Sequence, residues 1–511
     1  MPRLHDWALE QPDKVAFHIA ETGEAITYRE LDERADRVAS WLVSLGLKTG
    51  DTLALLLENH ARTFELWWGA RRAGVYYVPI STHLKAGEVS YIVRDCGARV
   101  FITSHTMHEL AGQVKDELAE HEAPHRFMLD GTIAGFSAYE QAVDSAPVVS
   151  LPERPLGREF MYSSGTTGFP KGIRRAQVPY AQRYALAPLE LQLRSIFRFE
   201  RDSIFLSPSP LYHATARFNI RTIECGGTCV ILGKYDAEAA LTAIERYRVT
   251  HSHWVPTMFV RMLALPPDTR QRFDVSSMQC AIHAAAPCPM HVKDAMIDWW
   301  GPVIEEYYGG SENLGVTYLN AQEWLAHRGS VGKTICGELH IMADDDPERE
   351  LPAGEIGMIY FAGGVPFQYH SDEGKTRSVF NSRGWGTYGD LGHIDADGYL
   401  YMSDRRTDLI ITGGVNIYPR EVELVLGEHP AVAEAAVIAI PNEAFGQEVK
   451  AVVELKEPDN AGPALAAELM QWCADRMSRM KCPRSVDFEV ALPRSDNGKL
   501  LKRVLRERYQ K

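Results

Sequence analysis

The sequence has no long apolar run and no paired cysteines. Its most apolar stretch near the C-terminus, residues 431–440, is too short to span a bilayer and contains Glu434. The first residues, MPRLHDWALEQPDK, lack the apolar core and cleavage site of a secretory signal. The eight cysteines are scattered without a C-x-x-C pair, which argues against a disulfide framework or a cysteine metal site. We therefore expect a cytoplasmic protein with reduced thiols and no stable membrane insertion.

An excess of basic residues is also missing. The formal net charge is −14, from 54 Lys and Arg against 68 Asp and Glu, whereas a protein that binds nucleic acid needs a basic face. Nucleic acid is therefore not an expected partner. Nucleotides stay open as ligands, because backbone donors and a few cations bind them locally. At 511 residues the chain exceeds one compact core, so we expect two or more domains.

The first part of the chain alternates between helical and strand patterns. Thr27 and Glu30 fit a capping box in front of apolar residues at helical spacing, and a buried strand is predicted at residues 52–57. The same pattern then predicts helices at 63–74 and 87–96 and strands at 76–79 and 100–103. Such alternation indicates parallel, doubly wound sheets and an α/β fold.

The pattern changes after about Arg405. The remaining sequence predicts helices at 419–426 and 463–480 and strands at 432–440 and 449–455. About one hundred residues with this mixture indicate a small α+β domain.

A loop rich in glycine and hydroxyl groups lies at residues 162–172, YSSGTTGFPKG. Glycines allow backbone N–H groups to approach a phosphate, Ser and Thr hydroxyls add donors, and Lys171 adds positive charge. The Walker A pattern cannot be aligned on it. A plain surface linker is the alternative, but threonine pairs between glycines are not typical of linkers. The loop therefore predicts phosphate binding.

At these residues the chain resembles the adenylate-forming superfamily of acyl-CoA synthetases, luciferases and peptide-synthetase adenylation domains. Further motifs similar to those of the family follow in its order over nearly the whole chain: 211–213 (LYH), 307–312 (YYGGSE), 389–390 (GD), 404–405 (DR), 413–419 (GGVNIYP) and 493–499 (PRSDNGK). The resemblance implies a large N-terminal AMP-binding domain, residues 1–404, of doubly wound sheets with a distorted barrel. It also implies a small mobile α+β C-terminal domain, residues 405–511.

The function that the resemblance implies is that of an acid–CoA ligase. A carboxylic acid and ATP would form an acyl-adenylate and pyrophosphate, and the acyl group would then pass to coenzyme A with release of AMP. The implied catalytic residues are Lys499, Glu312 and His213. The implied ATP and AMP site comprises Ser163, Ser164, Gly165, Thr166, Thr167, Gly168, Lys171, Ala285, Tyr308, Gly309, Ser311, Asp390 and Arg405. The other implied sites are Gly413 and Gly414 for CoA, His213, Trp254 and Gly310 for the acyl pocket and gate, Thr407 for the hinge, and Glu312 with Ser163 for Mg²⁺.

These residue types suit the reaction. Lys499 can bridge a carboxylate and the α-phosphate, two anions that otherwise repel each other. A Mg²⁺ ion on Glu312 would offset the triphosphate charge, and Asp390 can accept both ribose hydroxyls. Trp254 is explained equally well as a core tryptophan.

The sequence departs from the family pattern at two places. Residue 407 is Thr where the family has Lys or Asp, and residues 284–286 are Ala-Ala-Ala where the family has Gly-Gly-Ala. A hinge needs no charge, so we expect domain movement to persist, but methyl groups beside the nucleotide put adenylation at risk. Two alternatives therefore stay open: a thioesterification-only ligase that uses acyl-adenylate from a partner enzyme, and a catalytically silent nucleotide-binding protein.

Other members of the superfamily are weaker models. Residues 212–215 contain no aspartate to pair with a substrate amine, which disfavours an amino-acid-activating domain, whereas the motifs leave luciferase-type oxygenation open. Gly309, Gly310 and the alanines at 284–286 leave volume beside the reacting carboxylate. We therefore expect a bulky apolar acid, either fatty, terpenoid or steroidal, or aryl. A homodimer is compatible with the sequence.

Overall fold

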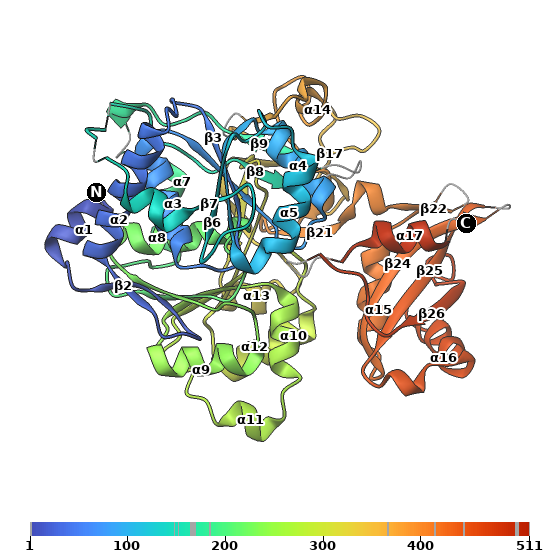
Figure 1. Cartoon of the computed structure of the whole chain (residues 1–511). Coiled ribbons are helices and arrows are strands. Elements are labelled where there is room, and N and C mark those ends of the chain that lie inside the picture. Colours follow the sequence, from blue (N-terminus) through green and yellow to red (C-terminus); the bar gives the residue numbers. More distant parts are fainter. Residues whose placement is uncertain are drawn as a thin grey trace.

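The computed structural model of the chain has a large N-terminal domain and a small C-terminal domain (Figure 1). It describes residues 3–147, 149–151, 153–163, 170–182, 185, 187–364, 367–412, 415–442, 445–495 and 500–509. The smaller domain lies to the right of the larger one in Figure 1. This arrangement confirms the predicted α/β class with a smaller second domain. The boundary at residues 404 and 405 stays a prediction, and strand β21 (Leu400–Arg405) ends there.

The first large sheet has five parallel strands in the order β4-β3-β5-β6-β7. The strands are β3 (Thr52–Leu56), β4 (Tyr76–Ile80), β5 (Ala98–Ser104), β6 (His125–Leu129) and β7 (Ser137–Ala138). The helices between and around them are α3 (Arg62–Ala73), α4 (Ala86–Asp95), α5 (His108–Glu117) and α6 (Tyr139–Asp144). Every residue of β3 is buried, as expected of a strand that pairs on both edges. The predicted alternation over residues 52–103 is confirmed.

The predicted capping box is present at the start of α2 (Tyr28–Ser44). Thr27 Oγ1 accepts from the Glu30 N–H at 3.3 Å, and Glu30 Oε2 accepts from the Thr27 N–H at 2.8 Å. These bonds satisfy two N–H groups that the start of a helix leaves without intrahelical partners. A Cβ at Gly69 of α3 would overlap Val38 of α2, so glycine allows these two helices to pack closely.

The second large sheet has nine strands in the order β16-β15-β14-β13-β12-β10-β11-β1-β2. Its strands are β1 (Val15–Ile19), β2 (Ala25–Thr27), β10 (Ile204–Ser207), β11 (Thr228–Ile231), β12 (His251–Trp254), β13 (Cys280–His283), β14 (Ile304–Gly309), β15 (Val316–Leu319) and β16 (Lys333–Cys336). The strands from β14 to β1 are parallel, and the carboxyl ends of β12, β13 and β14 meet at one edge. Open parallel sheets bind ligands at this edge.

Helices cover this sheet on both sides. The helices of this part of the chain are α1 (Leu4–Glu10), α7 (Pro188–Ile196), α8 (Arg217–Glu224), α9 (Ala237–Tyr247), α10 (Pro256–Leu263), α11 (Pro267–Gln271), α12 (Met290–Trp300) and α13 (Ala321–Ala326). Helices α9 to α12 lie together at the bottom of Figure 1.

The N-terminal domain also contains two small antiparallel sheets, in addition to the two large sheets. The resemblance implied a distorted barrel in this domain. One has the order β17-β18-β20-β21 and the other β19-β9-β8. Their further strands are β17 (Glu338–Met342), β18 (Gly357–Ala362), β20 (Asp390–Ile394), β19 (Gln368–Tyr369), β9 (Lys171–Arg174) and β8 (Met161–Ser163), and α14 (Glu373–Ser378) follows β19. These sheets carry four of the predicted site residues: Asp390 begins β20, Arg405 ends β21, Lys171 begins β9 and Ser163 ends β8.

The C-terminal domain is built on the sheet β24-β25-β26. Its elements are β22 (Ile410–Thr412), β23 (Val415–Ile417), α15 (Pro419–Gly427), β24 (Val432–Asn442), β25 (Gly446–Leu455), α16 (Pro463–Ala474), β26 (Ser485–Glu489) and α17 (Lys502–Tyr509). The prediction that the helix at Pro463 extends to Met480 was wrong, because α16 ends at Ala474. The chain turns after that point, and Cys482 packs in the same core as Cys473.

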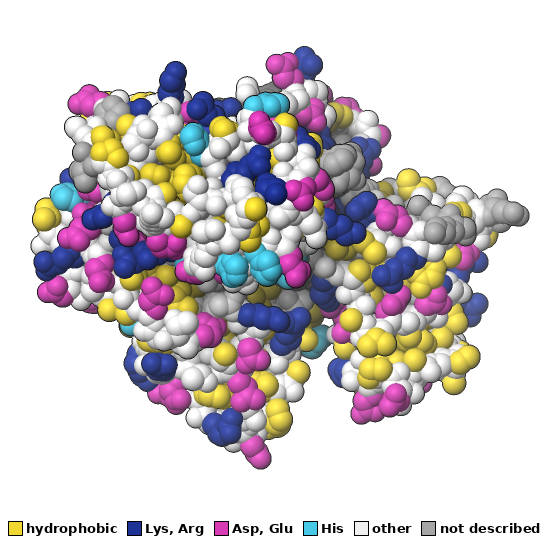
Figure 2. Space-filling model, viewed as in Figure 1, with side chains coloured by type: hydrophobic (Ala, Val, Ile, Leu, Met, Phe, Trp, Pro, Cys, Tyr) yellow, Lys and Arg dark blue, Asp and Glu magenta, His cyan; other side chains and the backbone are white. Residues whose placement is uncertain are grey.

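The described part of the chain contains no helix with the length and apolar character that crossing a membrane requires. All eight cysteines are free, as expected from their scattered positions. On the face shown in Figure 2, Lys and Arg side chains are interspersed with Asp and Glu, without one basic field.

Candidate active site

A large cavity of about 2550 Å³ opens between the two domains. Its wall includes the segments that follow β12, β13 and β14, together with parts of α15, β24 and the chain before α17. A pocket for one small ligand has roughly 300–1000 Å³, so several groups can bind here side by side. We name two regions after the ligands predicted for them: the nucleotide side, around Asp390 and Glu312, and the acyl side, along α8.

Three predicted ATP-site residues contact one another on the nucleotide side. The Tyr308 hydroxyl donates to Asp390 Oδ2 at 2.7 Å, and Arg405 Nε lies 3.3 Å from Asp390 Oδ1. Burial, with the neighbouring Asp390, raises the pKa of Tyr308 well above its usual value, so this hydroxyl stays protonated. Strands from two different sheets therefore converge on one buried carboxylate.

Glu312 adds a second carboxylate to the nucleotide side. Tyr369 donates its hydroxyl to Glu312 Oε1 at 2.9 Å. A Cβ at Gly310 would overlap the Tyr388 ring and lie 2.7 Å from Glu312 Oε2, so this position requires glycine for close approach. A half-buried carboxylate on a cavity wall suits a hard cation such as Mg²⁺, which binds through one or two carboxylates and keeps several waters.

The segment after β13, residues 284–286, has Ala-Ala-Ala where the family has Gly-Gly-Ala, and this difference affects the backbone. Ala285 has a φ of +75°, in the left-handed region that glycine adopts freely and that a residue with a Cβ adopts at a cost. Ala285 is exposed on the cavity wall, whereas Ala284 is buried. The backbone conformation at residue 285 therefore explains why the family has glycine there. With alanine, this chain has backbone strain at that position.

His213 lies on the cavity wall at the junction to the acyl side. It precedes the 3-10 turn Ala214–Ala216 that leads into α8, and its ring packs edge-on against Tyr212 with centroids 4.7 Å apart. Gly309 and Gly310 line the same cavity. Three of the residues predicted beside the reacting carboxylate thus line one cavity, and their role stays a prediction.

Trp254 does not reach the cavity. It is fully buried and packs against Phe259 and Trp300, and its Nε1 donates to Ser252 Oγ at 2.5 Å. The next residue, Val255, lines the cavity instead. Trp254 ends β12 with its side chain in the core, so this geometry supports the core interpretation over that of a gate.

The acyl side has a partly charged wall. Arg217 and Arg221 of α8 line it together with the rings of Phe197, Phe218 and Tyr307. The rings fit an apolar body of the acid, as expected, but nothing in the motifs predicted the arginines.

Thr407 lies between two ion pairs that hold the predicted hinge. Arg406 Nε lies 2.7 Å from Asp344 Oδ1 of the N-terminal domain, and Asp408 Oδ1 accepts from Arg506 of α17 at 2.6 Å. Thr407 itself is exposed. The uncharged hinge residue thus has a charged neighbour on each side, one bound to each domain.

The remaining predicted site residues divide into two sets. Lys171 and Ser311 line the cavity. Outside the described residues lie Ser164, Gly165, Thr166, Thr167, Gly168, Gly413, Gly414 and Lys499, as does the side chain of Ser163. The roles of these residues stay predictions.

Two tyrosines that the motifs did not single out support the nucleotide side. The Tyr388 hydroxyl accepts from the Leu314 N–H at 2.8 Å, and its ring lies against Tyr308. Its place two residues before Asp390 was a usable signal. Tyr369 had no such signal, because only folding brings its segment to Glu312.

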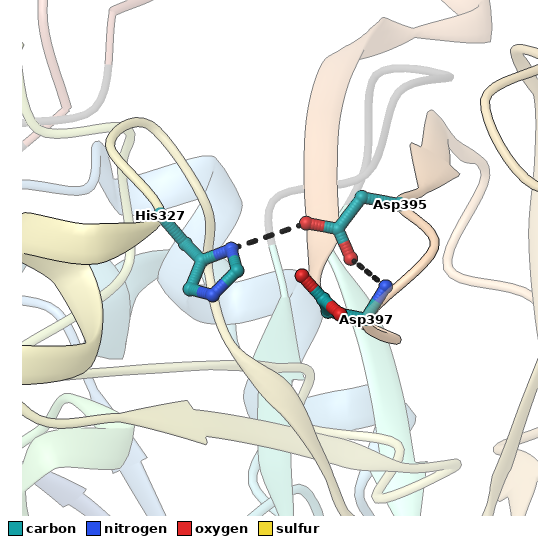
Figure 3. A group of neighbouring side chains, drawn as sticks. All are labelled: His327, Asp395 and Asp397. Atoms are coloured by element: carbon teal, nitrogen blue, oxygen red, sulfur yellow. Dashed lines mark hydrogen bonds and ion pairs between the residues drawn. The ribbon is translucent and has the colours of Figure 1, made fainter.

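A group of metal-ligating residue types lies away from the cavity: His327, Asp395 and Asp397 (Figure 3). His327 Nδ1 lies 3.2 Å from Asp395 Oδ2, and Asp395 Oδ1 accepts from the N–H groups of Asp397 at 3.0 Å and Tyr399 at 2.8 Å. The two backbone bonds close the turn between β20 and β21, and the contact with His327 ties this turn to the segment after α13, so the structure gives Asp395 a structural role.

Comparisons with known proteins agree with this architecture. The family model for AMP-binding enzymes matches residues 4–368, and the model for the AMP-binding enzyme C-terminal domain matches residues 421–499. Feruloyl-CoA synthase from an Amycolatopsis species is 32% identical over 496 residues, which cover 95% of this chain and 94% of the synthase.

Two further matches extend over almost the full chain. The long-chain-fatty-acid–CoA ligase FadD13 of Mycobacterium tuberculosis is 30% identical over 521 residues, with 98% of both chains covered. The crystal structure of ATP-bound MatB from Rhodopseudomonas palustris has a TM-score of 0.84 at 28% identity, and the match covers 100% of this chain and 99% of MatB.

Proposed function

This chain belongs to the AMP-binding enzyme family and is an AMP-forming acid–CoA ligase, and from this premise we propose that it performs both half-reactions by itself. ATP and CoA are its co-substrates. In the first half-reaction a carboxylate oxygen attacks the α-phosphorus of ATP, which forms the acyl-adenylate and releases pyrophosphate. In the second, the CoA thiol attacks the acyl carbonyl and AMP leaves.

The observation that carries this proposal is the contact of Tyr308 and Arg405 with Asp390 on the cavity wall. In the proposal Asp390 accepts the ribose hydroxyls, Arg405 donates to the ribose, and the Tyr308 ring packs on adenine. Hydrogen bonds formed before the ligand arrives orient these groups, so little is lost in ordering them on binding.

Catalysis is assigned to residues around the phosphates. Glu312 would hold Mg²⁺, which supplies positive charge at the phosphates when bound. Lys499 bridges the carboxylate and the α-phosphate, and this lowers the repulsion between the two anions in the transition state. Gly413 and Gly414 leave room for the pantetheine arm, since neither has a side chain.

For the acid we propose an apolar body, either fatty, terpenoid or steroidal, or aryl. The rings of Phe197, Phe218 and Tyr307 on the acyl side support this choice, as does similarity to enzymes named for ferulic and long-chain fatty acids.

The test measures the two half-reactions separately. ATP–pyrophosphate exchange with a panel of such acids reports adenylation, and thioester formation from presynthesised acyl-adenylate and CoA reports transfer. We expect both activities with the same acid. Exchange without transfer would contradict the CoA assignment, and failure of both would favour the silent nucleotide-binding alternative.

One observation favours the thioesterification-only alternative. Ala285 combines a left-handed backbone with a methyl group on the cavity wall where the family has glycine. Transfer without detectable exchange would identify this alternative, and Ala285→Gly should then restore part of the exchange.

A further inference from the structure

Positive charge is in excess on the acyl side of the cavity. The charged residues there form two groups, which together contain six arginines and three glutamates. They are Arg71, Arg158, Arg175, Arg194, Arg217 and Arg221 with Glu159, Glu190 and Glu224. Removing a charge from water costs several kcal/mol unless a partner compensates it. Such an excess beside a ligand cavity therefore raises the question of what balances it.

The first group centres on Glu159. Arg175 donates to Glu159 Oε1 at 2.8 Å, and Arg217 Nε lies 3.0 Å from the same oxygen. Burial alone would raise the pKa of Glu159, but Arg217, Arg175 and Arg158 outweigh it and hold that pKa at about 2. Burial, together with repulsion by Arg217, lowers the pKa of Arg175 to about 10. One carboxylate does not neutralise these arginines.

The second group lies between α7, α8 and α3. Arg221 donates through Nε and Nη2 to the two oxygens of Glu190 at 2.8 and 2.9 Å. Arg194 lies between Glu190, at 3.1 Å, and Glu224, at 2.7 Å, and Arg71 donates to Glu224 at 2.5 Å. Here two carboxylates face three guanidinium groups.

Some guanidinium nitrogens in these groups have no acceptor within the part of the chain that the structure describes. Arg217 Nη2 and Arg221 Nη1 are buried and form no hydrogen bond with any described residue, and Arg217 Nε contacts Glu159 without hydrogen-bond geometry. Arg221 as a whole is only 5% exposed. An unsatisfied buried donor costs about 1–3 kcal/mol, and more when it is charged. The Arg217 side chain as a whole is still 26% exposed and lines the cavity, so a ligand there can supply this guanidinium with an acceptor.

Arg72 lines the same cavity and shows a balanced arrangement. It contacts two carboxylates, those of Asp32 and Asp36. Arg72 thus differs from the arginines along α8, which outnumber their carboxylate partners.

The positions along α8 give the order of groups from the reacting end. Arg217 begins α8, four residues after His213 and beyond the 3-10 turn Ala214–Ala216, and Arg221 follows four helical residues later, a rise of about 6 Å. The Phe218 ring lies between the two arginines in sequence, with the Arg221 guanidinium 4.6 Å from its centroid. An acid with its carboxylate at His213 would therefore reach the Arg217 guanidinium first along α8, and the Phe218 ring and Arg221 lie beyond it.

From this arrangement we propose that the preferred substrate is a dicarboxylic acid, whose second carboxylate binds Arg217 at the start of α8, with Arg221 behind it. The inference rests on the proposed ligase function, because it specifies the acid of that same site. Guanidinium and carboxylate match in charge and in planar geometry, so this pairing is among the strongest that side chains form.

The experiment compares three acids with the same carbon chain: an α,ω-dicarboxylic acid, its half methyl ester and the monocarboxylic acid. The comparison is repeated for a series of chain lengths. The readout is kcat/KM for acyl-CoA formation. We expect wild type to prefer the diacid over the half ester by at least ~10-fold, since one charge-assisted pair contributes about 1.5–3 kcal/mol. Arg217→Met should abolish that preference, while Arg217→Lys should keep part of it.

Arg217 is the better target because Glu159 still has Arg175 when Arg217 is replaced, whereas Glu190 would lose its bidentate partner without Arg221. Arg328→Met is the matched control. Arg328 also lines the cavity but pairs with Asp294 of α12, so its loss should leave the diacid preference unchanged. Thermal unfolding of each variant shows whether it folds.

The outcomes separate this inference from the ligase function. If wild type has the same kcat/KM with the monoacid and the half ester as with the diacid, the inference is overturned and the ligase function stands. If folded Arg217→Met loses activity equally with all three acids, the arginine is structural and the inference is again overturned. If no acid releases pyrophosphate from ATP, both the ligase function and the inference fail.

Discussion

The two sides of the cavity satisfy their charges in different ways. On the nucleotide side Asp390 meets Tyr308 and Arg405, and Glu312 meets Tyr369, so the chain itself supplies the partners. On the acyl side Arg217 has buried N–H groups without an acceptor among the described residues. A site whose charged groups already have partners within the protein suits a ligand that binds in every turnover, such as ATP. A site whose donors lack acceptors among the described residues favours a particular ligand that supplies those acceptors.

This difference has a kinetic consequence. Changes on the nucleotide side should slow the reaction with every acid by the same factor, because each acid uses the same ATP. Changes on the acyl side should alter the ranking of acids. The predictions below test that division, beginning with the largest effect.

The largest effect is expected for Lys499→Ala. Adenylate formation should fall by at least ~10²-fold with every acid, as expected for loss of a positioned transition-state cation. Thioester formation from supplied acyl-adenylate should be much less affected. The measurement is ATP–pyrophosphate exchange beside the transfer assay, and equal losses in both would show that Lys499 serves the whole cycle or the fold.

Replacement of Asp390 by Asn should raise the KM for ATP by about 10- to 100-fold, since hydrogen bonds to a charged group contribute about 1.5–3 kcal/mol. Tyr308→Phe, which removes one donor to Asp390 and keeps the ring, should have a smaller effect in the same direction. Both variants should leave the ranking of acids unchanged. A changed ranking would break the division between the two sides.

Gly414→Leu concerns the CoA path rather than either side of the cavity. The added side chain should reduce thioester formation by roughly 10-fold or more, because a narrow path for the thiol tolerates little displacement at the reacting centre. ATP–pyrophosphate exchange should persist. If exchange falls as far as transfer, the loop is not specific to CoA.

The smallest effect is expected for Ala285→Gly. Relief of the left-handed backbone should stabilise the N-terminal domain by about 1 kcal/mol, which corresponds to a rise in its unfolding temperature of about 2 °C. Calorimetry measures this shift. Ala284→Gly is the control: Ala284 does not have a positive φ and is buried, so this change should not stabilise. A decrease in stability at position 285 would contradict the strain argument.

The fold followed from local patterns to a large extent. The capping box at Thr27 and the strand at 52–56 depend on side chains close in sequence, so their positions could be predicted within a few residues. The end of α16 could not, because Ala474 is the last helical residue for a tertiary reason: the chain turns to pack Cys482 beside Cys473.

By itself the sequence determined the family, the α/β class and the motif residues, because glycine spacing and short motifs are written in neighbouring positions. Only the tertiary structure decided which of those residues meet and which other residues join them. Tyr369 reaches Glu312, Trp254 turns into the core, and Arg217 meets Glu159 because separate segments converge in space. Charge balance within a cavity depends on distances between such segments, and no local pattern along the chain records those distances.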